Sequence, residues 1–164
     1  MGAMDRITVD GKTVNKKTRD ALAWAGRKFH RRYPKAPWQV AQGSYNTTVA
    51  ASAGTHDGGG VIDLRTTGAG MTADQRDYAL HCLKAAGFAA WIRDERDGMP
   101  PHIHACLLAS PGKFHPTMAY GARAQCISYL QGRNGLRSNG PDRNPARPRP
   151  QTRWSWKKKK PVAR

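Results

Sequence analysis

Close cysteine pairs are missing from the sequence. Its three cysteines, Cys82, Cys106 and Cys126, are an odd number, and no two of them have C-x-x-C spacing. This pattern indicates neither a disulfide framework nor a thiolate zinc site. We therefore expect three buried thiols.

Long apolar segments are missing as well. No stretch approaches the roughly 20 apolar residues that cross a membrane as a helix. The first residues, Met1 to Arg6, lack the apolar run of a signal peptide. These absences predict a soluble chain that is made in the cytoplasm and has no transmembrane segment, and they leave its oligomeric state open.

Acidic residues are few. The chain has 11 Asp and Glu against 28 Lys and Arg, which gives a formal net charge of +17. Residues 132–164 hold eleven of the basic residues and one acid, so this segment carries +10 of the net charge. Strong positive charge attracts nucleic acid, acidic lipid or an anionic cell-wall polymer without selecting among them.

The length of 164 residues predicts one domain with a single modest core. After Arg133 the composition changes to five prolines, a Trp-Ser-Trp segment and four consecutive lysines. We therefore expect a folded domain over residues 1–133 and an extended or disordered basic, proline-rich arm over residues 134–164.

The remaining patterns predict an α+β domain with a small, mainly antiparallel sheet flanked by helices. A capping box at Thr72 and Gln75 begins one of the helices, and Gly87 is a plausible stop for it. The expected helices cover residues 15–32, 72–86 and 117–131, and the expected strands cover residues 38–45, 61–66, 88–94 and 102–109.

Histidines and one aspartate carry the chemistry in this sequence. His102 and His104 alternate along an expected strand, so both imidazoles point to the same side. His56 precedes three glycines, and Asp63 lies on a neighbouring strand. Two imidazoles and a carboxylate can hold zinc and leave a fourth position for water or substrate. A further imidazole could move protons. A lone H-x-H pair is more often structural, but the combination favours a catalytic zinc site.

These residues resemble the zinc D-Ala-D-Ala peptidases and phage endolysin peptidases, a superfamily that includes lysostaphin-type enzymes and sonic hedgehog. The first motif of the family, H-x-x-G-x-A-x-D, matches His56, Gly59 and Asp63, with Val61 where alanine is usual. The second motif, H-x-H, matches His102-Ile103-His104. The resemblance covers residues 36–136.

Residues 42–46 and 52–55 are similar to the compact actinobacterial and actinophage branch of this family. The resemblance implies a hedgehog-like or DD-peptidase-like fold with one Zn²⁺ per chain. It also implies hydrolysis of a stem or cross-bridge peptide of peptidoglycan. The enzyme would act at the cell wall and could be phage-encoded or virion-associated.

The resemblance also implies the residue roles. His56, Asp63 and His104 would bind the metal, and His102 would act as general base and then general acid. Other members place an acid three residues before the last ligand, where this chain has Pro101. Asp97 or Glu95 from the preceding turn is the fallback base.

Relatives use an upstream basic side chain to bind the substrate carbonyl or carboxylate. The expected strand over residues 38–45 contains no arginine, so Gln42 is the expected hydrogen-bond donor there. Asp57 has two interpretations: it orients an imidazole, or more commonly it forms a turn. Structural or surface roles are expected for the three remaining histidines, which are His30, His81 and His115.

Two other functions compete with the peptidase. One is a non-catalytic, zinc-stabilised virion or wall-binding module, which a fourth protein ligand would favour. The other is a polyanion-binding or nucleic-acid-binding protein. Residues 153–157 interleave tryptophans with cations, a pattern that can stack on bases, retain an anionic wall polymer, or simply be solvated.

Overall fold

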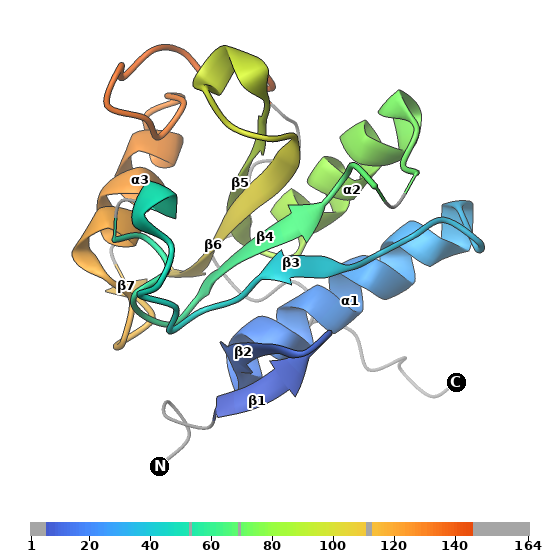
Figure 1. Ribbon diagram of the computed structural model, residues 1–164, viewed down its shortest axis with the longest axis horizontal. Coiled ribbons are helices and arrows are strands. Elements are labelled where there is room, and N and C mark those ends of the chain that lie inside the picture. The colour runs from blue at the N-terminus through green and yellow to red at the C-terminus, as the bar shows by residue number, and fades with distance from the viewer. Residues whose placement is uncertain (1–5, 53, 69, 111–112, 146–164) are drawn as a thin grey trace, which may run out of the picture.

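The computed structural model describes residues 6–52, 54–68, 70–110 and 113–145, and it has an α+β architecture (Figure 1). The elements in chain order are β1 (Arg6–Val9), β2 (Lys12–Asn15), α1 (Lys16–Arg32), β3 (Val40–Gln42), η1 (Ala50–Ser52), β4 (Val61–Arg65), α2 (Ala73–Ala85), β5 (Phe88–Arg93), η2 (Glu95–Asp97), β6 (His102–Ser110), β7 (Lys113–Phe114) and α3 (Tyr120–Leu130). The expected fold class, a small antiparallel sheet flanked by helices, is confirmed.

The central sheet has the strand order β3-β4-β6-β5, with β7 paired to β6, and all of its pairs are antiparallel. Helices α1 and α2 cover one face of this sheet and α3 lies on the other (Figure 1). Because side chains alternate along a strand, the two faces bury different residues. Ile62, Leu64 and Ile103 pack towards α1 and α2, whereas Val61 and Cys106 pack towards α3.

The helix signals in the sequence correspond to observed caps. Asn15 accepts a hydrogen bond from the Thr18 backbone N–H at 2.9 Å and begins α1. The capping box of Thr72 and Gln75 forms at the start of α2. Gly87 follows α2 with φ +100°, a conformation that glycine adopts without strain. The expected helix ranges, residues 15–32 and 72–86, agree with α1 and α2 to within one residue at each end.

The β1–β2 hairpin was not expected from the sequence. Its turn is Asp10-Gly11, with φ +50° and +73°, and this dipeptide favours a two-residue hairpin turn. The Asp10 carboxylate also accepts a hydrogen bond from the Val40 N–H at 2.8 Å, which ties the hairpin to β3. Strand β3 is shorter than the expected strand over residues 38–45, because the chain leaves the sheet after Gln42.

Residues 133–145 lie on the domain, although the sequence assigned nearly all of them to an extended arm. Lys84 is completely buried, donates to the Asn144 carbonyl at 2.7 Å and forms an ion pair with Asp142 at 3.4 Å. A buried ammonium needs such partners, so this segment belongs to the folded unit. Figure 1 shows it, in orange, beside η2. Residues 146–164, the rest of the expected arm, lie outside the described residues.

Across the described residues, no helix is both long and apolar enough to cross a membrane.

Candidate metal centre

Strands β4 and β6 bring the central side chains of the site together. Asp63 lies directly opposite His104 in the antiparallel register, so their side chains leave the same face of the sheet. His102 is two residues before His104 on β6 and therefore shares that face. This is the face that α3 covers, away from α1 and α2. The strand alternation expected from the sequence is confirmed.

The glycine loop positions His56. Gly59 donates its N–H to the Thr117 carbonyl at 3.0 Å, and a Cβ on Gly59 would lie 2.7 Å from the Tyr45 hydroxyl. The His56 carbonyl accepts a hydrogen bond from the Asn46 N–H at 2.9 Å. The loop therefore lies too close to its neighbours for a side chain at residue 59, which explains the glycine of the first motif.

All three imidazoles donate their outer N–H to an oxygen that can only accept. Nδ1 of His56 bonds the Gly43 carbonyl at 2.7 Å, and Nδ1 of His102 bonds the Pro100 carbonyl at 2.6 Å. Nε2 of His104 bonds Oε1 of Gln125 at 2.7 Å. In a neutral imidazole with one nitrogen donating, the other nitrogen carries a lone pair. When the outer nitrogen of a neutral ring donates in this way, its inner nitrogen is free to bind a metal ion.

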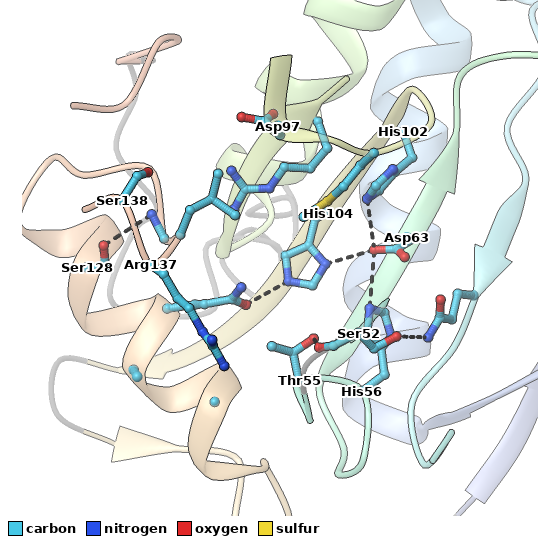
Figure 2. Close-up of a pocket in the computed structure, with 18 of the residues that line it drawn as sticks. Ser52, Thr55, His56, Asp63, Asp97, His102, His104, Ser128, Arg137 and Ser138 are labelled. Atoms are coloured by element: carbon cyan, nitrogen blue, oxygen red, sulfur yellow. Dashed lines mark hydrogen bonds and ion pairs between the residues drawn. The ribbon is translucent and has the colours of Figure 1, made fainter. Parts of the chain in front are cut away.

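The three inner nitrogens converge on one carboxylate oxygen, Oδ1 of Asp63 (Figure 2). The distances are 2.8 Å from His104 Nδ1, 3.3 Å from His56 Nε2 and 3.8 Å from His102 Nε2. Lone pairs that face a carboxylate repel it unless a cation lies between them. The arrangement therefore requires a proton or a metal ion at the point where these atoms meet.

The pKa shifts agree with this requirement. Burial disfavours the charged form of His56, but the hydrogen bond and charge of Asp63 outweigh it and raise the pKa of His56. Burial opposes ionisation of Asp63 too, yet hydrogen bonds and charges from His104 and His56 hold its pKa well below the usual value. Burial lowers the pKa of His104 in spite of Asp63. The pocket thus favours an ionised carboxylate with a cation beside it.

His56, Asp63 and His104 can hold a metal ion. Their ligand atoms all lie within 4.8 Å of one another. Tetrahedral zinc with bonds of about 2.1 Å places its ligand atoms about 3.4 Å apart. The 3.3 Å between His56 and Asp63 fits this spacing. The 2.8 Å between His104 and Asp63 would have to open by about half an ångström. Two imidazole nitrogens and a carboxylate oxygen are a donor set that zinc accepts.

The site opens into a pocket of about 1030 Å³. On one side the pocket is lined by the metal ligands and His102, and on the other by α3 and by residues 135–139 of the segment after it. Figure 2 shows Ser128 and Ser138 across the pocket from Asp63 and His102. The candidate ligands are thus largely buried, and a pocket large enough for a peptide adjoins them.

The other residues expected at the site have different outcomes. Gln42 lines the pocket, with its amide N–H donating to the Ser52 hydroxyl at 2.8 Å. Asp97 also lines the pocket, but Arg143 holds its carboxylate in an ion pair. Glu95 is absent from the described lining of the pocket. Asp57 is exposed, and Gly43 rather than Asp57 accepts the His56 N–H, so Asp57 does not orient this imidazole.

The remaining histidines lie outside the site. His30 bonds the Ala36 carbonyl, and His81 stacks on the Tyr78 ring at 5.6 Å. His115 is buried beside Thr117, whose hydroxyl lies 2.9 Å from its Nδ1. These positions fit the structural and surface roles expected for them.

Sequence reasoning missed Gln125 and Arg93. Gln125 comes from α3 and bonds His104, and Arg93 ends β5 and lines the pocket. No local pattern marks Gln125, because its role depends on how α3 lies against the sheet. Arg93 carries a weak signal, since it is a charged residue at the end of an otherwise apolar strand.

Comparisons of the chain with protein-family models, with curated proteins and with solved structures gave no match.

Proposed function

We propose that this protein is a zinc-dependent peptidase that hydrolyses a stem or cross-bridge peptide bond of peptidoglycan. The observation that carries the proposal is the convergence of three imidazole nitrogens on the Asp63 carboxylate, in rings whose outer nitrogens are bonded to other oxygens. The adjoining pocket can accept a peptide chain. The substrate class is supported by the resemblance of the two histidine motifs to the D-Ala-D-Ala peptidases and phage endolysin peptidases, which implies action at the cell wall.

His56, Asp63 and His104 would hold the zinc ion. When bound, zinc lowers the pKa of a water molecule towards about 7 and polarises the carbonyl that is attacked. The protein residues that fix this centre are Gly43 and Gln125, because their oxygens accept the outer N–H groups of the two ligand imidazoles.

His102 is the proposed proton carrier. Its Nδ1–H bonds the Pro100 carbonyl, so Nε2 is the basic nitrogen, and Nε2 faces the same carboxylate oxygen as the ligands. Of the three imidazoles, it is the farthest from that oxygen and the most exposed, with 17% of the side chain accessible. It would take a proton from the attacking water and return it to the leaving amine. Gln42, on the pocket wall, is the proposed hydrogen-bond donor to the substrate.

Incubation of the purified full chain with peptidoglycan preparations of different peptide chemistry tests the proposal. We expect one equivalent of zinc, release of new amino groups, loss of this release with a chelator and recovery with added zinc. His104→Ala should lose metal and activity together. His81→Ala, which alters a histidine on α2 outside the pocket, should keep both. The proposal is wrong if the zinc-loaded protein releases no amine from any of these substrates.

A further inference from the structure

Residues 12–35 hold most of the positive charge of the described domain. They contain nine Lys and Arg and a single acid, Asp20, which gives a net charge of +8. The other described residues contain eleven Lys and Arg and nine Asp and Glu, which gives +2. Eight of the nine basic residues are exposed, and Lys28 is half-buried. We call these nine residues the basic surface: Lys12, Lys16, Lys17, Arg19, Arg27, Lys28, Arg31, Arg32 and Lys35.

Helix α1 places the basic surface on the side of the molecule away from the pocket. The buried residues of α1, among them Leu22, Ala25 and Phe29, pack into the core that α1 shares with α2 and the sheet. Because the apolar and charged residues of an amphipathic helix lie on opposite sides, the cations of α1 face outward. The candidate metal centre lies on the face of the sheet that α3 covers, and Figure 1 shows α1 and α3 on opposite sides of the sheet. A ligand on the basic surface would therefore leave the pocket open.

The start of α1 carries cations where a helix disfavours them. Lys16, Lys17 and Arg19 lie in the first turn, which contains no acid. The partial positive charge of a helix N-terminus repels such side chains. Asp20 offsets part of this repulsion, because its carboxylate lies 2.6 Å from both Lys16 Nζ and Arg19 Nε. This half of the basic surface is thus partly neutralised by the protein itself.

The second half of α1 has four cations and no acid. Arg27 and Arg31 are like charges four residues apart, as are Lys28 and Arg32, and such pairs destabilise a helix. No ion pair in the described part of the chain involves any of these four residues. A concentration of like charge that opposes its own helix indicates an anionic partner that neutralises it.

The aromatic rings beside the basic surface are occupied by its own cations. Lys28 Nζ lies 5.8 Å from the centre of the Trp24 ring, and the Arg32 guanidinium lies 5.3 Å from the Tyr33 ring and 4.7 Å from the Tyr78 ring. A single strand of nucleic acid binds by stacking its bases on aromatic rings. Bases would have to displace these cation–π contacts in order to stack here. The surface is therefore suited to phosphates rather than to unpaired bases.

The basic surface also lacks apolar side chains that could enter a lipid bilayer. Among the residues that the structure describes, every large hydrophobic side chain that is exposed lies outside residues 12–35. A helix that binds in a membrane interface buries its apolar face there, whereas the apolar face of α1 is already in the protein core. The surface thus lacks the hydrophobic half of a membrane-binding helix.

The spacing of the cations matches the backbone of a DNA duplex. Helix α1 has seven cations in 17 residues, which at a rise of about 1.5 Å per residue is one cation per about 3.6 Å of helix. Each strand of double-stranded DNA carries one phosphate per about 3.4 Å of its axis. The bases of a duplex are paired with each other, so this ligand needs no aromatic platform on the protein.

We propose that the basic surface binds the phosphate backbone of double-stranded DNA without reading its sequence. Contacts from Lys and Arg to phosphates position a protein on DNA but carry no sequence information. The inference goes beyond the proposed function and does not depend on it, because the basic surface and the pocket lie on opposite sides of the sheet.

Titration of the purified full chain into a fluorescently labelled DNA duplex of about 20 base pairs tests the inference. Fluorescence anisotropy measures the affinity at salt concentrations between about 50 and 200 mM. We expect the logarithm of the association constant to fall linearly with the logarithm of the salt concentration, because bound phosphates release their counterions. Two duplexes of different sequence should bind within about 3-fold of each other.

A triple variant with Arg27→Gln, Arg31→Gln and Lys35→Gln removes three exposed charges from the basic surface. Glutamine is a good helix former, and Lys28 and Arg32 keep their ring contacts, so we expect this variant to fold, which circular dichroism checks. Each phosphate contact releases about 0.9 counterions. We therefore expect the affinity at about 0.1 M salt to fall at least about 50-fold, and the slope of the salt dependence to decrease by about 2 to 3.

The matched control is a triple variant with Arg96→Gln, Arg133→Gln and Arg137→Gln. It removes the same number of charges from exposed residues of η2 and of the segment after α3. We expect its affinity for the duplex to stay within about 5-fold of the wild-type value, because exposed charges away from the ligand are screened by salt. Equal losses in the two variants would overturn the inference, since they would indicate a diffuse effect of net charge.

Comparison of ligands with the wild-type chain needs no variant to fold. At equal phosphate concentration, we expect a single-stranded oligonucleotide, poly(glycerol phosphate), and vesicles of phosphatidylglycerol and phosphatidylcholine each to bind at least about 10-fold more weakly than the duplex. Tighter binding of any of these three would overturn the inference and identify the partner as a single strand, a wall polymer or a membrane. Wild-type affinity in the Arg27, Arg31 and Lys35 variant would also overturn it, because the binding would then belong to residues outside the basic surface. Amine release is no part of this test, so the inference and the proposed function can fail separately.

Discussion

Gln125 offers a sharp test of how the imidazole tautomers are set. Its Oε1 lies 2.7 Å from Nε2 of His104 and favours the proton on that nitrogen, so that Nδ1 keeps the lone pair that a metal needs. In Gln125→Leu this acceptor is gone, and the proton can move to Nδ1. There it would donate to the Asp63 carboxylate across the existing 2.8 Å. Zinc would then have to displace that hydrogen bond before it could bind His104.

The expected size of the effect follows from the strength of that hydrogen bond. A hydrogen bond to a charged group is worth about 1.5–3 kcal/mol, and each 1.4 kcal/mol is tenfold in affinity. We therefore expect Gln125→Leu to weaken zinc binding about 10- to 100-fold, the range typical for loss of a residue that orients a ligand histidine. Competition with a chromophoric chelator measures this affinity directly.

Two further variants make the test specific. Gln125→Glu keeps an oxygen acceptor and should bind zinc nearly as well as the wild-type chain. Gln131→Leu makes the same chemical change at the exposed end of α3 and should leave zinc affinity unaltered. Gln125 does not control the tautomer of His104 if Gln125→Leu binds zinc within about 3-fold of wild type, or if Gln131→Leu loses as much affinity.

Three other predictions concern the folded unit and the charge of the site. Lys84→Met should cost about 3–5 kcal/mol in denaturant unfolding because it leaves Asp142 buried and unpaired, and adding Asp142→Leu should recover most of this loss. A chain ending at residue 145 should keep the zinc affinity of the full chain. A chain ending at residue 133 should unfold at a lower denaturant concentration than the chain ending at 145. Equal stability of the two truncated chains would contradict the assignment of residues 133–145 to the domain. Zinc affinity should fall as the pH is lowered, starting above the ordinary histidine pKa of 6.5, because the raised pKa of His56 lets protons compete with the metal earlier; an onset below 6.5 would contradict this pKa shift.

Much of the fold could be predicted from local signals in the sequence. The capping box at Thr72 and the glycine after α2 are short-range features, and the structure forms them as expected. Alternation along one expected strand predicts that His102 and His104 lie on the same face of the sheet. Asp63 was expected on a neighbouring strand, and the structure pairs the two strands. The Asp10-Gly11 dipeptide also favours a hairpin turn, but the first element expected from the sequence was the helix over residues 15–32, so the hairpin was missed.

Features that depend on tertiary packing could not be predicted in the same way. The acceptors for the imidazoles are two main-chain carbonyls and the Gln125 amide, which leave no signature in composition or spacing. The segment over residues 133–145 has the composition of a linker, yet the burial of Lys84 gives it a fixed place. Arg93 Nη2 is buried without a hydrogen-bond partner among the described residues, which depends on the packing around β5 and on no local sequence pattern.

Comparing zinc binding and amine release in His102→Ala and His104→Ala tests the central claim most directly. The two residues lie on one strand and point to one carboxylate, but only His104 is assigned as a ligand. We predict that His104→Ala loses zinc and activity, whereas His102→Ala keeps about one equivalent of zinc and releases no amine. If His102→Ala loses zinc as completely as His104→Ala does, His102 is a fourth ligand. The site would then be a closed structural centre rather than a catalytic one.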